Sequence, residues 1–171
     1  MDNFKKLKAT EITQNLIGLI SKSMLITAGE RDNFNTMTAS WGGVAFLWNK
    51  PVVFIFVRPE RYTNYFLENT DTFSLSFFDD SYKKQLLFCG TKSGKDVDKV
   101  KETGLTPLFT KEGTPIFAEA ELLLECKKLY VDKFNEEFFL DKDMLEQFYG
   151  EKGGLHRIFI AEVTNVWQKD E

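Results

Sequence analysis

The sequence predicts a mainly β fold, an antiparallel barrel with helical decorations. About six or seven segments have strand character and several short ones have helical spacing, and the two kinds do not alternate as in a parallel α/β fold. The 171 residues contain no internal repeat, low-complexity tract or linker. These observations indicate one domain over residues 1–171, with enough chain to bury a core rich in aromatic rings.

Strands are expected where apolar and β-branched residues alternate or run together between turn residues. The expected strands are, in chain order, Met24–Ala28, Phe34–Trp41, Val52–Val57, Thr72–Phe77, Phe117–Val131 and His156–Trp167. A turn over Gly29–Asn33 joins the first two into a hairpin, and Gly42 and Gly43 break the pattern after it. The third is a continuous apolar run between two prolines, and the fourth alternates between apolar and hydroxyl side chains. The fifth, long or bent, follows a segment broken by proline and glycine, and the sixth is apolar on both faces, like a barrel wall.

Helices are expected where apolar residues recur every three or four positions beside a capping residue. The expected helices are 11–21 with Thr10 as cap, a helix from Pro59 to Asn69, Ser81–Cys89 with Gly90 as its stop, a short helix ending at Gly104, and one up to Tyr149 with Asp141 as cap and Gly150 as stop. Proline suits a first helical turn because its missing N–H needs no partner there, and glycine suits the residue after a last turn.

Composition argues against several classes of function. The formal charge of −4, the sequence pI near 5.2 and the lack of a basic block argue against nucleic acid as the main partner. Two distant cysteines, Cys89 and Cys126, and a single histidine give no metal-ligand spacing, so no metal site is expected. No apolar run reaches the roughly 18 residues of a membrane helix. We therefore expect a soluble, cytoplasmic protein with free thiols and no membrane contact.

The most informative motif is a hydroxyl-rich strand followed, after the next strand, by a helix start with two arginines. Thr36, Thr38 and Ser40 lie at a spacing of two, which places their hydroxyls on one face of a strand. The run from Arg58 to Thr63 then brings two guanidinium groups to free helix-start N–H groups, as an anionic phosphate requires. This pattern indicates a site for a phosphorylated cofactor. The alternative is that the hydroxyls are ordinary strand residues and the arginines solvate a surface helix.

An ordered set of motifs resembles the flavin reductase-like family, the FMN-binding split β-barrels that include flavoredoxin. The set consists of Asn35–Trp41, Pro51, Arg58-Pro59, Arg61-Tyr62-Thr63, Cys89-Gly90, Ser93-Gly94, Asp98, Lys99, and His156 ahead of Glu162-Val163. The resemblance extends over about residues 12–167. It implies a homodimer of antiparallel, Greek-key split barrels, with FMN held noncovalently near the dimer interface.

The same resemblance implies roles for individual residues. Thr38, Ala39, Ser40 and Trp41 would line the isoalloxazine and ribityl part of the flavin. Arg58, Arg61, Tyr62 and Thr63 would hold the phosphate, and Ser93 and Lys99 would close over the flavin. Two roles remain open for Trp41. Its ring either stacks on the flavin or covers the pocket mouth, or it packs under Gly42 and Gly43 in the dimer interface.

One departure concerns the use of NAD(P)H. Many family members that reduce free flavin have Gly-Asp-His before the last strand, whereas this chain has Gly154-Leu155-His156. His156 is either a catalytic residue that contacts nicotinamide or flavin, or a hydrogen-bonded structural residue at a strand start. The leading hypothesis is an oxidoreductase that passes electrons from NAD(P)H through FMN to a small-molecule or protein acceptor. A flavoredoxin-type electron carrier without nicotinamide chemistry, and a noncatalytic module for flavin, haem or pyridoxal phosphate, are the alternatives.

Overall fold

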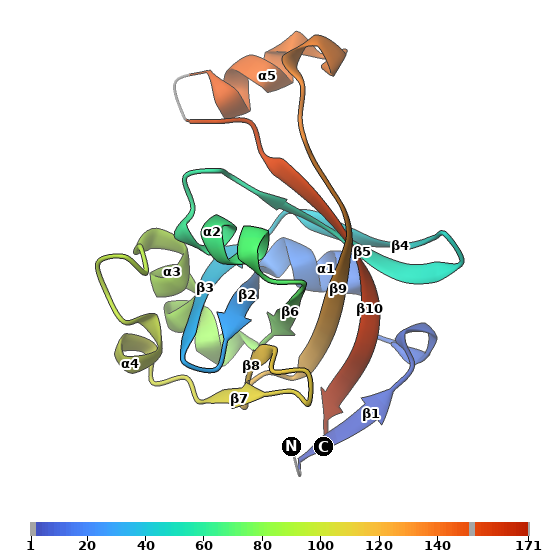
Figure 1. Ribbon diagram of the computed structural model, residues 1–171, viewed down its shortest axis with the longest axis vertical. Helices are drawn as coiled ribbons and strands as arrows, with labels where there is room; N and C mark the ends of the chain where they lie inside the picture. Colours follow the sequence, from blue (N-terminus) through green and yellow to red (C-terminus); the bar gives the residue numbers. More distant parts are fainter. Residues whose placement is uncertain (1–2, 151–152, 171) are drawn as a thin grey trace.

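The computed structural model describes residues 3–150 and 153–170, and an eight-stranded antiparallel sheet lies at its centre (Figure 1). The strands of this sheet are β1 (Phe4–Leu7), β2 (Met24–Glu30), β3 (Asn33–Ala39), β4 (Gly42–Leu47), β5 (Lys50–Val57), β6 (Thr72–Phe77), β9 (Leu122–Lys133) and β10 (Arg157–Lys169). They lie in the order β3-β2-β6-β9-β10-β5-β4, and β1 pairs with β10 beside this path. A separate hairpin joins β7 (Pro107–Phe109) to β8 (Pro115–Phe117). The predicted fold class, mainly antiparallel β with helices, is confirmed.

The long strand β10 joins two parts of the barrel. Its first half pairs with β5, from Arg157 opposite Val57 to Glu162 opposite Val52, whereas its last residues pair with β1. On its other side it pairs with β9 along nearly its whole length, with two register shifts. Such shifts bend and twist a strand locally, so the β9–β10 ribbon continues beyond the barrel at one end. Figure 1 shows this ribbon rising from the barrel, with both chain termini at the opposite end.

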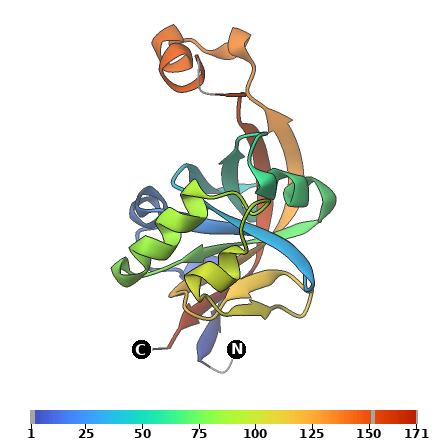
Figure 2. The same cartoon turned by 90° about the vertical axis from the view of Figure 1, so that its left-hand side faces the viewer.

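Five α-helices decorate the barrel in the described part of the chain. They are α1 (Leu16–Lys22), α2 (Tyr62–Asn69), α3 (Lys83–Thr91), α4 (Lys99–Thr103) and α5 (Lys142–Tyr149), with single 3-10 turns at Ala9–Glu11, Asp80–Tyr82 and Glu136–Phe138. Helices α2, α3 and α4 lie on the side of the β2–β3 hairpin (Figures 1 and 2). Helix α5 stands apart at the end of the β9–β10 ribbon and has no buried residue. Within the described part of the chain, none of the helices has the length and apolarity needed to cross a membrane.

The main core lies inside the barrel and contains both rings and aliphatic side chains. Phe73, Phe77 and Phe159 are among its largest fully buried residues, and Met24 and Ile26 pack with them. Burial of these apolar side chains away from water provides the main driving force for folding. Both cysteines are free and buried.

The first helix begins later than the sequence predicts. Asn15 is its cap, with Oδ1 accepting a hydrogen bond of 3.0 Å from the Gly18 amide, and α1 starts at Leu16. Thr10 lies in the 3-10 turn Ala9–Glu11 instead. The predicted start at residue 11 is therefore wrong, because the apolar spacing continues through a segment that packs on the core without forming a helix.

Other predicted boundaries are also wrong, and the helix expected from Pro59 begins at Tyr62. Gly42 and Gly43 open β4 rather than ending the sheet pattern, and a Cβ at Gly42 would lie 2.8 Å from the Phe54 carbonyl oxygen. Glycine is needed there because two strands approach closely. The single strand expected over Phe117–Val131 is two strands, since β8 ends at Phe117 and β9 begins at Leu122. Strands β1 and β4 were not expected at all.

Candidate functional site

The end of β3 and the start of β10 face a cleft of about 330 Å³, here called the central cleft. The residues that line it are Met37, Thr38, Ala39, Ser40, Trp41, Phe56, Arg58, Arg61, Gln147, Phe148 and His156. Seven of the residues singled out from the sequence are among them, although they come from segments more than 100 positions apart. Antiparallel pairing of β5 with β10 brings these segments together.

A second cleft of about 220 Å³ adjoins the first at Arg61 and surrounds the start of α2; we call it the α2 cleft. Its lining residues are Asn35, Glu60, Arg61, Tyr62, Thr63, Gly90, Thr91, Lys92, Ser93, Gly94 and Lys99. All of the remaining sequence-predicted site residues line this cleft. The two clefts therefore form one elongated site with an aromatic end and a cationic end.

Arg61 stands at the junction of the two clefts. It is the N-cap residue of α2, and no side chain caps this helix start. Its Nη2 atom is buried and has no hydrogen-bond partner among the described residues, and burial lowers the pKa of its guanidinium. A buried cation without a partner is costly, and a helix N-terminus attracts negative charge. This position suits an anion such as a phosphate group.

Asn35 organises the α2 cleft, and sequence reasoning did not give it a role. Its Nδ2 donates a buried hydrogen bond of 2.8 Å to the Thr63 hydroxyl, which joins β3 to α2. Gly94 packs against it so closely that a Cβ there would lie 2.0 Å from Asn35 Oδ1. The signal in the sequence was the pair of a strand asparagine and a loop glycine, but their contact cannot be read from spacing alone.

Lys99 lies buried beneath the α2 cleft, and its expected role in closing over the flavin stays a prediction. Its Nζ donates hydrogen bonds of 2.8 Å to the carbonyl oxygens of Thr36 and Cys89. Burial lowers the pKa of Lys99 to about 8, the Cys89 thiol opposes this, and Arg61 lowers it further. The amine therefore holds β3 and α3 together. Ser93 turns the loop above it, with its carbonyl accepting from the Asp96 amide at 3.1 Å.

Arg58 faces α5 rather than the α2 cleft. Its Nη2 donates a 2.7 Å hydrogen bond to the Phe148 carbonyl, and its guanidinium lies 5.3 Å from the centre of the Tyr149 ring. Of the two arginines, Arg61 lines both clefts, whereas Arg58 lines the central cleft alone and ties α5 to the barrel.

His156 lies at the inner end of the central cleft. Its Nδ1 is 2.8 Å from the Tyr149 hydroxyl, and its ring centre is 5.0 Å from that of Trp41. Burial lowers the pKa of His156 to about 4, with Arg58 acting in the same direction and Glu60 opposing it. The imidazole is therefore neutral at neutral pH. Trp41 packs on this ring and on Phe148, at 5.3 Å between ring centres, and borders the cleft mouth.

A third cleft of about 310 Å³, the α3 cleft, lies on the other side of the β3 end. It shares Thr38, Ala39 and Ser40 with the central cleft. The Thr38 hydroxyl donates a 2.5 Å hydrogen bond to the Leu86 carbonyl, and a Cβ at Gly90 would lie 3.2 Å from Thr38 Cβ. The small residue Gly90 thus lets α3 pack closely on β3. Gly90 lies inside α3, which ends at Thr91, so the predicted helix stop at Gly90 is wrong.

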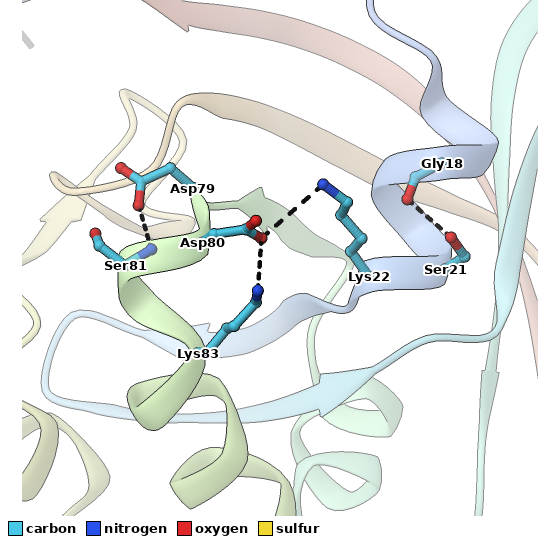
Figure 3. Close-up of polar contacts among 7 residues, drawn as sticks. All are labelled: Gly18, Ser21, Lys22, Asp79, Asp80, Ser81 and Lys83. Atoms are coloured by element: carbon cyan, nitrogen blue, oxygen red, sulfur yellow. Dashed lines mark hydrogen bonds and ion pairs between the residues drawn. The ribbon is translucent and has the colours of Figure 1, made fainter.

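An ion-pair cluster fixes one border of the α3 cleft. Asp80 Oδ1 forms ion pairs with Lys22 Nζ at 3.9 Å and with Lys83 Nζ at 3.3 Å, as Figure 3 shows. The two lysines join the end of α1 to the start of α3 and leave this border positively charged. In the same part of the figure, the Asp79 carboxylate accepts from the Ser81 amide at 2.6 Å and caps the turn before α3. Among residues 3–150 and 153–170, no three His, Cys, Asp or Glu side chains gather to hold a metal ion.

Comparison with solved structures finds proteins of the same fold. Solved structures similar to this chain include an FMN-binding protein from Thermus thermophilus, at 22% identity, a TM-score of 0.68, and coverage of 86% of this chain and 71% of that one. A flavoredoxin from Methanosarcina acetivorans matches at 20% identity and a TM-score of 0.68, covering 86% and 68% of the two chains. An NADH:FAD oxidoreductase from Streptomyces globisporus matches at 21% identity and a TM-score of 0.64, covering 85% and 74%.

Sequence comparison gives two further results. No curated protein matches the chain. The family profile described as "Flavin reductase like domain" matches residues 18–171, which is most of the chain. The matched residues include every residue of the central and α2 clefts. Because the match extends over residues 18–171, the chain belongs to the flavin reductase-like family.

Proposed function

We propose that the protein is a single-domain FMN-binding oxidoreductase that takes electrons from NAD(P)H and passes them through the flavin to an acceptor. The observation that carries this proposal is the buried, unpartnered Nη2 of Arg61 at the uncapped start of α2. FMN joins a phosphate to a flat, uncharged ring system, and the cationic α2 cleft continues into a central cleft lined by Trp41 and His156. The names of the Thermus and Streptomyces structures support a flavin ligand and, for the second, NADH.

The residues present fit FMN in a definite orientation. Arg61 and the first turn of α2, at Tyr62 and Thr63, would hold the phosphate, with the buried charge of Lys99 beneath them. The backbone from Thr38 to Trp41 would bond the polar edge of the ring system and place it in the central cleft. The bound flavin supplies the two-electron chemistry.

The protein's own part in the reaction is binding, orientation and exclusion of water. Trp41 packs on both Phe148 and His156 in the lining of the central cleft, and these rings would keep water from a bound flavin. His156 would act as a neutral hydrogen-bonding group, because its pKa of about 4 leaves it uncharged at neutral pH. If the Tyr149 hydroxyl donates to Nδ1, the proton of the imidazole resides on Nε2, where it can donate to a ligand.

A second candidate is an electron carrier without nicotinamide chemistry. It is favoured by Leu155, an apolar residue beside His156 where related flavin reductases have aspartate. Leucine offers no hydrogen bond to a nicotinamide amide. Under this proposal, reducing equivalents would come from another protein, as the name flavoredoxin implies for the Methanosarcina structure.

An anaerobic titration separates the two candidates. The purified protein should be yellow, or become yellow on reconstitution with FMN, and NADH or NADPH should bleach the flavin band. A yellow protein that chemical reductant bleaches but NAD(P)H does not would select the electron carrier. A protein that fails to bind FMN at any tested concentration would overturn both.

We also propose a cytoplasmic homodimer. Large apolar side chains are exposed on α1, on β4 and in the turn after β4: Ile17, Val44, Phe46 and Trp48. Phe46 is 68% exposed, and a patch of exposed apolar side chains is typical of an interface between proteins. A second copy that covers it would bury the patch by a twofold arrangement.

A further inference from the structure

An open apolar cavity of about 520 Å³ lies directly beside the central cleft. We call it the aromatic chamber; its lining residues are Trp41, Phe56, Phe134, Phe139, Asp141, Met144, Phe148 and Tyr149. It shares Trp41, Phe56 and Phe148 with the central cleft, so a molecule in the chamber would lie next to the proposed flavin ring. Its volume is in the range that holds one small organic ligand.

Most of the chamber wall comes from residues 134–149, a segment that we call the arm. The arm leaves the barrel at the end of β9 and carries α5, which stands above the barrel in Figures 1 and 2. Several contacts hold it in place, among them the hydrogen bond from Arg58 to the Phe148 carbonyl, the one between Tyr149 and His156, and the 3.0 Å bond from the Phe134 amide to the His156 carbonyl. The walls of the chamber are thus the arm on one side and the barrel residues Trp41 and Phe56 on the other.

The rings of the chamber pack in fixed geometry. Phe56 and Phe134 are nearly parallel, with 5.5 Å between ring centres and 12° between planes. Phe139 meets Phe134 at 5.7 Å and 68°, and Tyr149 at 5.7 Å and 68°. Faces and edges of several rings are therefore presented to one cavity, an arrangement that suits a flat aromatic guest.

The polar groups of the chamber are already engaged. Asp141 is the only charged residue among the described residues that line it, and the Asp141 carboxylate caps α5 by accepting from the Asp143 amide at 3.0 Å. The Tyr149 hydroxyl is bonded to His156. The Arg58 guanidinium, 5.3 Å from the centre of the Tyr149 ring, lies outside this lining and donates to the Phe148 carbonyl. The described lining itself therefore supplies no lysine, arginine or histidine to offset the desolvation of an anion.

We propose that the aromatic chamber binds a flat, uncharged ring compound of the quinone class, and that this compound is the electron acceptor of the oxidoreductase. The role as acceptor rests on the proposed function; binding of the ring does not. The reaction balances as NAD(P)H, a proton and the quinone giving NAD(P)⁺ and the hydroquinone. Both electrons and one hydrogen come from the nicotinamide as hydride through the flavin, and the second proton comes from water.

The nicotinamide nucleotide itself fits the chamber poorly. Its phosphates need cations and its carboxamide needs donors and acceptors, and the lining supplies neither. The lysine-bordered α3 cleft, which also adjoins Thr38 to Ser40, is better suited to those phosphates. The quinone and the nucleotide would then approach the flavin from different clefts.

The first experiment measures binding of dimethylnaphthoquinone to the FMN-loaded protein by titration calorimetry. Its hydroxy-methyl analogue, which has nearly the same shape and is an anion at neutral pH, serves as the charged comparison. We expect the neutral quinone to bind at least about tenfold more tightly than the anion, because the chamber does not compensate a charge. Equal affinity for the two, or no binding of the neutral quinone, would overturn the inference.

A matched pair of variants locates the site. Phe139 lines the chamber, whereas the adjacent Phe138 is 77% exposed and does not. Phe139→Ala should weaken neutral-quinone binding by about tenfold or more, and Phe138→Ala should change it by less than about twofold. Equal losses in both variants would place the quinone elsewhere.

A charge substitution tests the chamber independently of ring loss. Met144 lines the chamber and is half exposed, so a lysine there can be tolerated. Met144→Lys should reverse the preference and favour the anionic analogue. An unchanged preference in this folded variant would contradict the proposed location. Dissociation of a dimer by Phe139→Ala, but not by Phe138→Ala, would also contradict it, because the chamber rings would then belong to a subunit interface.

The two proposals can fail separately. FMN affinity and bleaching by NAD(P)H are measured on the same samples without quinone. An FMN-loaded protein that NAD(P)H reduces but that binds no quinone overturns only the present inference. Quinone binding that depends on Phe139 in a protein that binds no FMN overturns the oxidoreductase and the acceptor role, and supports the chamber as a ring site.

Discussion

The Tyr149 hydroxyl at the end of α5 lies 2.8 Å from Nδ1 of His156 just before β10, and this hydrogen bond joins the arm to the barrel. His156 is buried and packs on Trp41, so its protonation state affects both the arm and the central cleft. The pair connects the stability of the site to pH.

Acid should destabilise the protein through His156. Its pKa is about 4 in the folded state, against 6.5 for an unperturbed histidine, so the unfolded chain binds the proton more readily. The contribution to stability is complete above 6.5 and is lost as the pH falls from 6.5 towards 4. Thermal unfolding midpoints of the wild type and His156→Leu, measured across this interval, should show a steeper decline for the wild type. Parallel curves would contradict a neutral, buried imidazole.

Removal of the Arg61 side chain should weaken FMN binding without unfolding the protein. A charge-assisted hydrogen bond contributes about 1.5–3 kcal/mol, so Arg61→Ala should reduce FMN affinity by about 10- to 100-fold. Riboflavin, which lacks the phosphate, should bind the variant and the wild type about equally. Arg31→Ala, in an exposed turn outside both clefts, is the matched control and should leave FMN affinity unchanged. A similar loss for riboflavin would mean that Arg61 does not contact the phosphate.

FMN affinity should decrease as the pH rises above about 8. Lys99 has a pKa of about 8, so its positive charge beneath the α2 cleft is present below this pH and is lost above it. A bound phosphate would raise this pKa, and by linkage proton loss weakens phosphate binding. In Lys99→Met, affinity should be lower and should lose this dependence. Fluorescence titrations with FMN across the alkaline range check the prediction, with riboflavin as the ligand that should not respond.

A single methyl group at Gly94 should disturb the α2 cleft. A Cβ there would lie 2.0 Å from Asn35 Oδ1, so Gly94→Ala must displace Asn35 and break its hydrogen bond to Thr63. We expect FMN affinity to fall by about tenfold, since one buried hydrogen bond is lost and the helix start shifts. Gly43→Ala is the control, because no atom lies within 4 Å of a Cβ at Gly43. Equal FMN affinity in the two variants would exclude a role for Asn35.

A charge in the exposed patch on β4 should dissociate the proposed dimer. Phe46→Glu places a carboxylate in this patch, and burial of an unpaired charge in an interface costs several kcal/mol. Sedimentation should show a monomer for Phe46→Glu and a dimer for the wild type. Leu140→Glu, at a side chain that is 99% exposed on the arm, should stay dimeric. A monomeric wild type would remove the dimer from the proposed function.

Alternation of side-chain types along the sequence predicted strands whose bounds depend on neighbouring residues alone. Thr72–Phe77 alternates strictly, and β6 has these same bounds because one face packs on the core. The same reasoning failed at Gly42, where glycine is required by the nearby Phe54 carbonyl, a partner that sequence spacing does not identify.

Long-range contacts set the details of the site that sequence could not supply. Arg61 and Thr38, which the motifs assigned to one site, line the same central cleft, whereas the two bonds that Lys99 donates to backbone carbonyls could not be read from the sequence. Asn35 and Thr63 are 28 positions apart, and their contact follows from how α2 packs on β3. The chamber was not expected either, because aromatic residues in the arm look like core residues until the arm is seen to leave the barrel.

The position of the arm at the tip of the β9–β10 ribbon makes it separable from the rest of the fold. Residues 134–149 pair with no barrel strand, and α5 has no buried residue, so their sequence can change with little cost to the core. The α2 cleft is built entirely from other segments, although Gln147 and Phe148 of the arm line the central cleft. Exchange of this one contiguous stretch between homologous proteins would therefore alter which molecules reach the proposed flavin site while the α2 cleft is retained.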